Sequence, residues 1–213
     1  MRRFIPILFA CASGFAGTIQ TSVTCDGVTY FGSGSASCGD NQNVGASALA
    51  TDQFVDVGVF NAPLNSASAW ALFSMDYVLT VFGGSGDGFA EPQLEALSAP
   101  NFGQDSSAAG ADLGCEALAE GGDRYNTCTP TSLPFVFGVP QTLTLSMDAQ
   151  ATASNYGYDS MEANAGFGGF WFYVNGQPFD ATYTFTPVPE PGMFPLLAAM
   201  ACAALIAKRL HNR

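Results

Sequence analysis

The chain has 213 residues, among them eighteen acidic, six basic and one histidine side chain, and its formal net charge is −12. Seventeen of the acidic residues but only one basic residue, Arg124, lie between residues 17 and 187, so this region has a formal charge of −16 and no Lys or His. Nucleic-acid binding is therefore excluded, because such a surface repels the phosphate backbone. The same composition excludes a Ser-His-Asp triad, a Cys-His pair, a Lys base and a histidine metal site.

The N-terminal segment has the three parts of a secretory signal peptide. Arg2 and Arg3 precede an apolar stretch, and small residues at 14–16 follow it, as a signal peptidase requires. We predict a signal peptide over residues 1–16. In an alternative interpretation, the residues before Cys11 form a lipoprotein box and this cysteine is acylated.

The region from residue 17 to residue 187 has the length of a single domain, and its hydrophobic pattern has a period of two. Gln141–Ala153 alternates apolar and polar side chains throughout, which predicts a strand with one buried and one wet face. Asn175-Gly176 is a dipeptide suited to a type I′ hairpin, in which both central residues have positive φ. Further strands are expected at Gly17–Thr24, Val28–Gly32, Val44–Thr51, Gln53–Phe60, Ser68–Phe73, Asp76–Gly83, Leu133–Val139, Phe167–Val174 and Ala181–Thr186.

These ten short strands, separated by Gly, Asn, Ser and Pro, predict an all-β fold. The expected architecture is an antiparallel β-sandwich of jelly-roll type. Residues 90–130 are expected to differ from the rest: Glu91–Leu97 is predicted as a helical turn and the remainder as long loops. Gly83–Gly88 lacks the lysine of a phosphate-binding loop and is interpreted as a hairpin tip.

Cysteine spacing predicts the covalent connections of the domain. Cys11 and Cys202 belong to the terminal segments. Four cysteines remain: Cys25, Cys38, Cys115 and Cys128. An even number in an exported domain indicates two disulfides, and the equal spacing of thirteen residues favours pairing the first two and the last two. A zinc site is improbable, since no His accompanies them and the spacing is not that of metal ligands.

Four carboxylates surround the second cysteine pair: Asp112, Glu116, Glu120 and Asp123. Carboxylate and turn carbonyl oxygens are suitable ligands for Ca²⁺, so these residues form a hypothetical calcium site. Their spacing does not match an EF-hand, and the alternative is solvated loop charge that serves solubility. No other cofactor is expected.

Five aromatic residues are candidates for a sugar-stacking platform: Trp70, Trp171, Tyr173, Tyr156 and Tyr158. Trp171 and Tyr173 share one face of their strand, and one face of that strand must be buried, so a structural role is the alternative. Paired carboxyls about 5 to 9.5 Å apart would suit glycoside hydrolysis, but no motif selects a pair. Thr142-Leu143-Thr144 is similar to the threonine rows of ice-binding proteins, in a single copy.

The C-terminus has three parts. They are the motif Val188-Pro189-Glu190-Pro191, an uncharged apolar segment over residues 192–207, and a tail over residues 208–213 with Lys208, Arg209 and Arg213. The prolines exclude regular helix before the apolar segment, which reaches about 24 Å as a helix and is short for a hydrocarbon core of roughly 30 Å. The basic tail predicts that everything before the segment lies outside the cytoplasm.

This arrangement resembles the PEP-CTERM sorting signal of Gram-negative bacteria, over residues 188–213 only. The resemblance implies that an exosortase, a membrane protease or transpeptidase, recognises Val188, Pro189, Glu190 and Pro191, removes the tail and passes the protein to the cell surface or the extracellular polysaccharide. The chain would then cross the inner membrane and be held there transiently through residues 192–207. An ordinary C-terminal membrane anchor is the alternative.

Together these features predict an exported, non-catalytic β-sandwich with a structural or adhesive role in the cell-surface or matrix layer. A carbohydrate-binding module is the alternative function. A carboxylate-dependent glycosidase is the enzymatic alternative.

Overall fold

The computed structural model describes residues 17–39, 44–61, 65–100, 105–129, 132–154 and 159–188. The predicted signal peptide, the chain from Pro189 onward, and the candidate aromatics Tyr156 and Tyr158 lie outside these described residues. Within the described ranges, the structure contains no helix long and apolar enough to cross a membrane.

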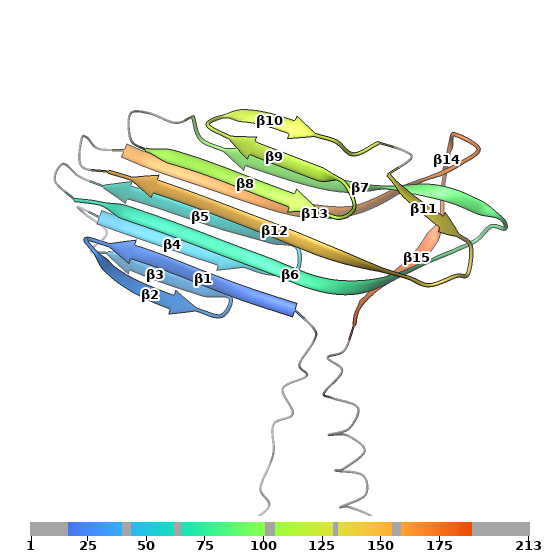
Figure 1. Ribbon diagram of the computed structural model, residues 1–213, viewed down its shortest axis with the longest axis horizontal. Coiled ribbons are helices and arrows are strands. Elements are labelled where there is room, and N and C mark those ends of the chain that lie inside the picture. Colours follow the sequence, from blue (N-terminus) through green and yellow to red (C-terminus); the bar gives the residue numbers. More distant parts are fainter. Residues whose placement is uncertain are drawn as a thin grey trace, which may run out of the picture.

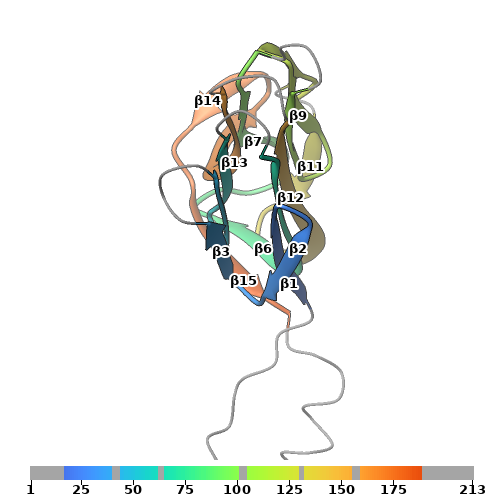
Figure 2. The same ribbon diagram turned by 90° about the vertical axis from the view of Figure 1, so that its left-hand side faces the viewer.

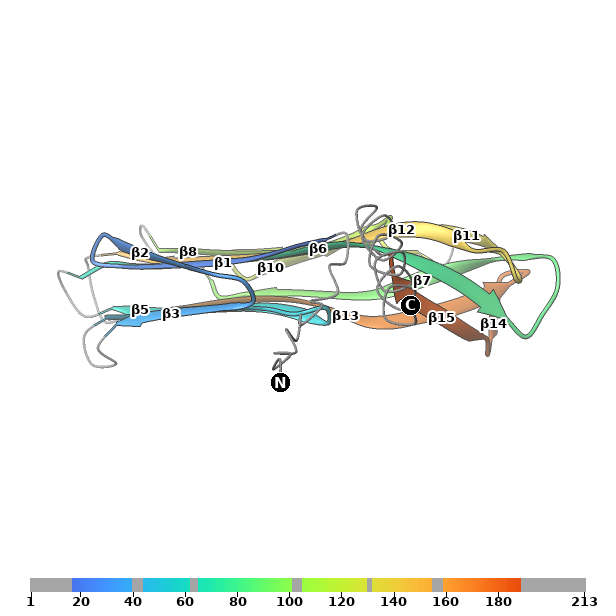
Figure 3. The same cartoon turned by 90° about the horizontal axis from the view of Figure 1, so that it is seen from below.

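The described residues form fifteen strands in two antiparallel sheets that stack face to face, as Figure 1 and the views in Figures 2 and 3 show. Sheet I contains β1 (Gly17–Cys25), β2 (Val28–Gly32), β6 (Ala67–Phe82), β8 (Ser106–Asp112), β9 (Glu116–Glu120), β10 (Asp123–Asn126), β12 (Gln141–Ala153) and β15 (Thr182–Pro187). Sheet II contains β3 (Ser35–Gly39), β4 (Val44–Ala50), β5 (Phe54–Asn61), β7 (Asp87–Ser98), β11 (Leu133–Val136), β13 (Asp159–Val174) and β14 (Gln177–Phe179). The predicted antiparallel β-sandwich is confirmed.

The strand order interleaves distant parts of the chain. In sheet I β12 lies between β6 and β8, and in sheet II β13 lies between β5 and β7. Two groups of four, β6-β12-β8-β9 and β5-β13-β7-β11, therefore follow the strand order of a jelly roll. Strands β1 and β2 extend sheet I beyond β6, and strands β4 and β3 extend sheet II beyond β5.

The prediction for residues 90–130 is wrong. Glu91–Leu97 is the middle of β7, and three further strands, β8, β9 and β10, stand where long loops were expected. Glu, Leu and Ala favour helix, but Ala90, Leu94 and Ala96 alternate into the core and the segment pairs with β13. Tertiary pairing therefore overrides the local preference.

Other strand boundaries also differ from the prediction, most of them by one to three residues, and β6 and β13 differ most. The segments Ser68–Phe73 and Asp76–Gly83 belong to one strand, β6, because β12 pairs with it without interruption from Ala67 to Leu79. The strand expected at Phe167–Val174 begins earlier, at Asp159. The short strands β3 and β14 were not predicted at all.

The core between the sheets changes character along the strands. One half is filled by small side chains: Ala67, Ala69, Ala71, Ala149, Ala151, Ala153, Ala163 and Ala165. The other half is filled by aromatic rings: Phe73, Tyr77, Phe135, Phe170 and Phe172. Burial of a phenylalanine contributes about 1.5–3 kcal/mol, so the aromatic half contributes more per residue.

Both predicted disulfides are present. Cys25 at the end of β1 bonds to Cys38 in β3, with a Cα–Cα distance of 6.1 Å, and thereby joins the two sheets at one edge. Cys115 bonds to Cys128 with a Cα–Cα distance of 5.0 Å and closes the β9–β10 hairpin. Such bonds are typical of an oxidising environment, extracellular or periplasmic.

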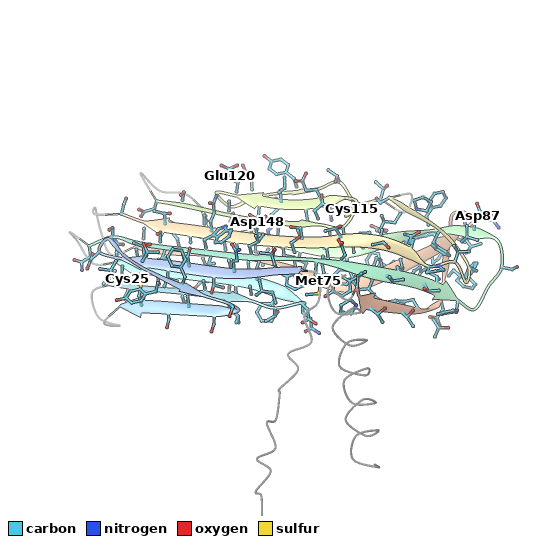
Figure 4. The ribbon with its side chains drawn as sticks, turned by 60° about the horizontal axis from the view of Figure 1, so that its bottom comes forward. Cys25, Met75, Asp87, Cys115, Glu120 and Asp148 are labelled. Carbon is cyan, nitrogen blue, oxygen red and sulfur yellow. A yellow bond between two sulfur atoms is a disulfide. The ribbon has the colours of Figure 1, made fainter. Side chains whose placement is uncertain are left out.

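The two ends of the folded domain lie side by side at the middle of β6, near Met75 in Figure 4. Gly17 at the start of β1 pairs with Met75, and Pro187 at the end of β15 pairs with Tyr77. The Val188 N–H then donates a hydrogen bond to the Asp76 carbonyl, at 2.8 Å. The described strands share one core, which both disulfides flank.

Candidate functional site

A β-bulge in β13 sets the orientation of the candidate aromatic side chains. The register of β13 against β7 shifts between Phe167 and Phe170, and Gly169 has a φ of +117°, a conformation that L side chains rarely adopt. The extra residue moves the alternation by one position, so both phenylalanines pack into the interior, with ring centroids 5.2 Å apart. Trp171 and Tyr173 consequently face outward, and Trp171 is 57% exposed.

An interior cluster of rings supports this strand from behind. Phe170 contacts Tyr183 and Phe185 of β15 with edge-to-face geometry, at centroid distances of 5.6 and 5.2 Å. Phe185 stacks on Tyr77 of β6 at 4.3 Å, and Phe172 contacts Phe135 of β11 at 5.7 Å. Each such pair stabilises the fold by about 0.5–1.5 kcal/mol beyond its buried area. The backbone that carries Trp171 is therefore held by rings from several strands.

A carboxylate lies beside these outward-facing aromatics. Glu91 of β7 is directly opposite Trp171, and the neighbouring pair is Phe89 with Tyr173. The pKa of Tyr173 is raised above 10.0. The causes are desolvation of its hydroxyl, the hydrogen bond of this hydroxyl to the Glu91 carboxylate, and the charge of that carboxylate. This part of sheet II presents two aromatic rings and a hydrogen-bond acceptor on one surface.

Trp171 and Tyr173 line an open groove of about 740 Å³, where β13, β14 and β15 meet at the right-hand end of Figure 1; Glu91 lies on the neighbouring strand β7, beside the groove and not in its lining. Its lining includes Trp171, Tyr173, Pro178, Asp180 and Tyr183. The volume lies within the usual range for small-ligand sites of about 300–1,000 Å³. Flat apolar rings with a few acceptors are suited to binding a polyhydroxylated ring, whose C–H face stacks on an aromatic ring while its hydroxyls donate hydrogen bonds.

The predicted five-residue aromatic platform is not assembled as one surface. Trp70 lies on the outer face of sheet I, between Ser22 of β1 and Gln150 of β12, on the opposite side of the sandwich from Trp171. Only Trp171 and Tyr173 share a site within the described part of the chain. The prediction that one face of their strand is buried is confirmed, and the buried face is the one with Phe172.

The structure does not bring the four candidate calcium ligands together. Asp112 pairs with Glu116 across β8 and β9, whereas Glu120 pairs with Asp123 across β9 and β10. The two pairs lie at opposite ends of β9, about 13 Å apart at the rise of an extended strand; Figure 4 shows Glu120 well separated from Cys115. Asp112 instead accepts a hydrogen bond from the Gly114 N–H. Among the described residues, no group of three or more His, Cys, Asp or Glu is placed to hold a metal ion, so this placement does not support the calcium hypothesis.

Two carboxylate pairs on the outer faces have a perturbed member. Burial and the charge of Glu162 raise the pKa of Asp56 above 3.8, and burial and the charge of Glu116 raise the pKa of Asp148. Asp56 lies beside Phe54 and Glu95 in a separate, smaller cavity of sheet II. Neither Asp56 nor Asp148 lines the aromatic groove.

Sequence reasoning missed Glu91, Asp180 and Tyr183 as members of the site. Glu91 was assigned to a helical turn, and only its pairing with Trp171 shows that it belongs beside the aromatics. Tyr183 reaches the groove because β15 crosses to sheet I and pairs with β6. Comparisons with protein-family models, curated proteins and solved structures find no match to this chain.

Proposed function

We propose that this protein is an exported, non-catalytic β-sandwich that acts in adhesion at the cell surface or in the extracellular matrix, by binding carbohydrate in the aromatic groove. The observation that carries the proposal is Trp171, which is 57% exposed on a strand that interior rings hold in place. A large rigid aromatic beside a groove is costly to leave in water, and stacking on a sugar ring removes that cost. Asp180 in the groove lining and Glu91 beside Trp171 supply acceptors for hydroxyl groups.

Binding of a glycan array by residues 17–188 tests this function. Trp171→Ala should weaken binding to the selected glycans by about tenfold or more, the equivalent of roughly 1.4 kcal/mol. Trp70→Ala is the matched control, because this tryptophan lies on the other sheet and its loss should leave binding unchanged. Equal losses in the two variants would show that the groove is not the site. An array without any bound glycan would leave a purely structural role in the matrix.

The proposed location depends on the C-terminus as a sorting signal that an exosortase-type protease reads at the inner membrane. The Val188 N–H hydrogen bond to the Asp76 carbonyl supports this assignment, because it places the first residue of the motif directly after β15, beside the middle of β6. Mass spectrometry of the surface protein should show a C-terminus close to residues 188–191. Recovery of surface protein that still ends in Arg213 would favour a permanent anchor.

A carboxylate-dependent glycosidase is the second candidate, and the raised pKa of Asp56 beside Glu162 favours it. A general acid needs such a shift so that it keeps its proton near neutral pH. The assay is release of reducing sugar from the array-selected glycans. Hydrolysis that Asp56→Asn and Glu162→Gln each abolish would replace the non-catalytic proposal.

A further inference from the structure

The carboxylate of Glu91 is flanked by aromatic rings on a single surface. Directly opposite residues in an antiparallel pair have Cβ atoms about 4.5–5.5 Å apart, and Glu91 is opposite Trp171. Tyr173, two residues further along the same strand, donates a hydrogen bond from its hydroxyl to Glu91. A carboxylate next to exposed aromatic side chains is suited to binding organic cations, since the π-face of Trp or Tyr attracts a positive charge as well.

Within the part of the chain that the structure describes, no basic side chain neutralises this surface. Residues 17–188 contain one cationic side chain, Arg124. Arg124 lies in β10 at the edge of sheet I, beside Tyr125, and lines a different cavity. The groove lining contains one carboxylate, Asp180, and Glu91 lies beside the groove, opposite Trp171. An anionic ligand would therefore meet unscreened carboxylates, whereas a cationic one would meet both a charge partner and aromatic faces.

From this arrangement we propose that the groove, together with the Glu91 carboxylate beside Trp171, selects glycans with free, protonated amino groups, such as polymers of deacetylated hexosamine, over their neutral N-acetylated forms. The inference rests on the proposed carbohydrate-binding function and specifies its ligand class. The sugar ring stacks on Trp171, and its ammonium group lies between that ring and the Glu91 carboxylate. Polysaccharides of uronic or sulfated sugars are repelled.

General attraction between a cationic polymer and a protein of charge −16 must be separated from recognition at the site. Salt at about 0.15 M screens exposed charges beyond about 8 Å, so measurements at this ionic strength suppress the general effect. Glu120→Gln supplies the matched control for Glu91→Gln. Both substitutions remove one negative charge from an outer strand surface, but Glu120 lies in β9 of sheet I, on the other sheet from the groove.

The experiment compares the Kd of glucosamine oligomers with that of N-acetylglucosamine oligomers of equal length, by calorimetry on the purified full chain. The wild-type protein should bind the amino form about tenfold more tightly. Glu91→Gln should remove most of this preference while the weaker binding of the N-acetylated form persists. Trp171→Ala should weaken the binding of both forms, and Glu120→Gln should behave as the wild type.

Each contrary result identifies the part that fails. Equal Kd values for the two oligomers in the wild type would overturn the preference for cationic sugars but leave carbohydrate binding intact. Equal effects of Glu91→Gln and Glu120→Gln would reduce the preference to general electrostatic attraction and overturn the assignment to Glu91. Failure to bind either oligomer, with other glycans bound on the array, would overturn the ligand class alone, whereas an empty array would remove the proposed function itself.

Discussion

Ionisation of individual carboxylates lowers the stability of the folded state in this acidic domain. Asp148 in β12 is the clearest case, because burial and the nearby Glu116 raise its pKa above 3.8. The folded state therefore holds this proton more tightly than the unfolded state, and the contribution of Asp148 to stability falls as the pH rises above 3.8.

Asp148→Asn should accordingly raise the melting temperature at neutral pH. The advantage should shrink as the pH falls through the raised pKa of Asp148, because the wild-type carboxyl then becomes neutral as well. Thermal denaturation at about pH 7 and about pH 3 measures both effects. Asp87→Asn, at the exposed start of β7 (Figure 4), is the control and should change little. A lower melting temperature for Asp148→Asn at neutral pH would contradict this account.

A buried phenol should make the fold sensitive to alkali. Burial and the charge of Asp52 raise the pKa of Tyr77 to about 12, so the folded state binds its proton more tightly above pH 10.0 and stability is lost as the pH rises from there. Tyr77→Phe keeps the ring stacked on Phe185 and removes the titrating group. Urea unfolding should show the variant gaining about 1 kcal/mol on the wild type between about pH 9 and about pH 11. Parallel pH curves for the two proteins would refute the assignment.

At the scale of single elements, the bulge of β13 is the feature on which the groove depends. A Cβ at Gly169 would lie 3.1 Å from the Tyr183 hydroxyl oxygen, and the φ of +117° is strained for any other residue. A Cβ at the adjacent Gly168 would make ordinary contacts of 3.5 Å with Gln93. The two glycines are therefore neighbours with opposite tolerance to substitution.

Gly169→Ala should destabilise the domain by about 1–3 kcal/mol and weaken glycan binding, because Trp171 and Tyr183 both depend on the local geometry. Gly168→Ala is the matched control and should be nearly neutral in both respects. Chemical denaturation and the array-selected glycan measure the two effects. Equal tolerance at the two positions would mean that the bulge does not orient the site.

For the whole molecule, the two disulfides close loops of equal length in different places. Cys25–Cys38 joins sheet I to sheet II, whereas Cys115–Cys128 lies within the β9–β10 region. The chain-entropy model assigns about 3 kcal/mol to a loop of this size in either case. The stability that each bond contributes is therefore similar, while the part of the fold that each bond holds is different.

Replacing either pair by alanine should lower the free energy of unfolding by about 3 kcal/mol. Loss of Cys25–Cys38 should in addition increase hydrogen exchange in β2 and β3, and loss of Cys115–Cys128 in β9 and β10. Urea unfolding and exchange measured by mass spectrometry test both statements. A uniform rise in exchange across the two sheets in either variant would contradict this division.

Local patterns in the sequence determined a large share of this architecture. Strand β12 was predicted at the bounds it has, because thirteen residues of strict alternation leave one dry face that only a sheet can bury. The disulfide pairing followed from equal short loops. The prediction failed at Glu91–Leu97, where helix-forming residues are held in β7 by pairing with β13 and by burial of Leu94 and Ala96.

The site required the tertiary structure. Glu91 and Trp171 face each other only because β13 inserts between β5 and β7, and Tyr183 joins them only because β15 crosses to the opposite sheet. Strand periodicity shows which side chains share a face, but not which distant strand lies alongside, since pairing depends on burying the whole core at once. The sequence by itself therefore determined the fold class and the covalent links, and chain crossing between the sheets decided which residues form the groove.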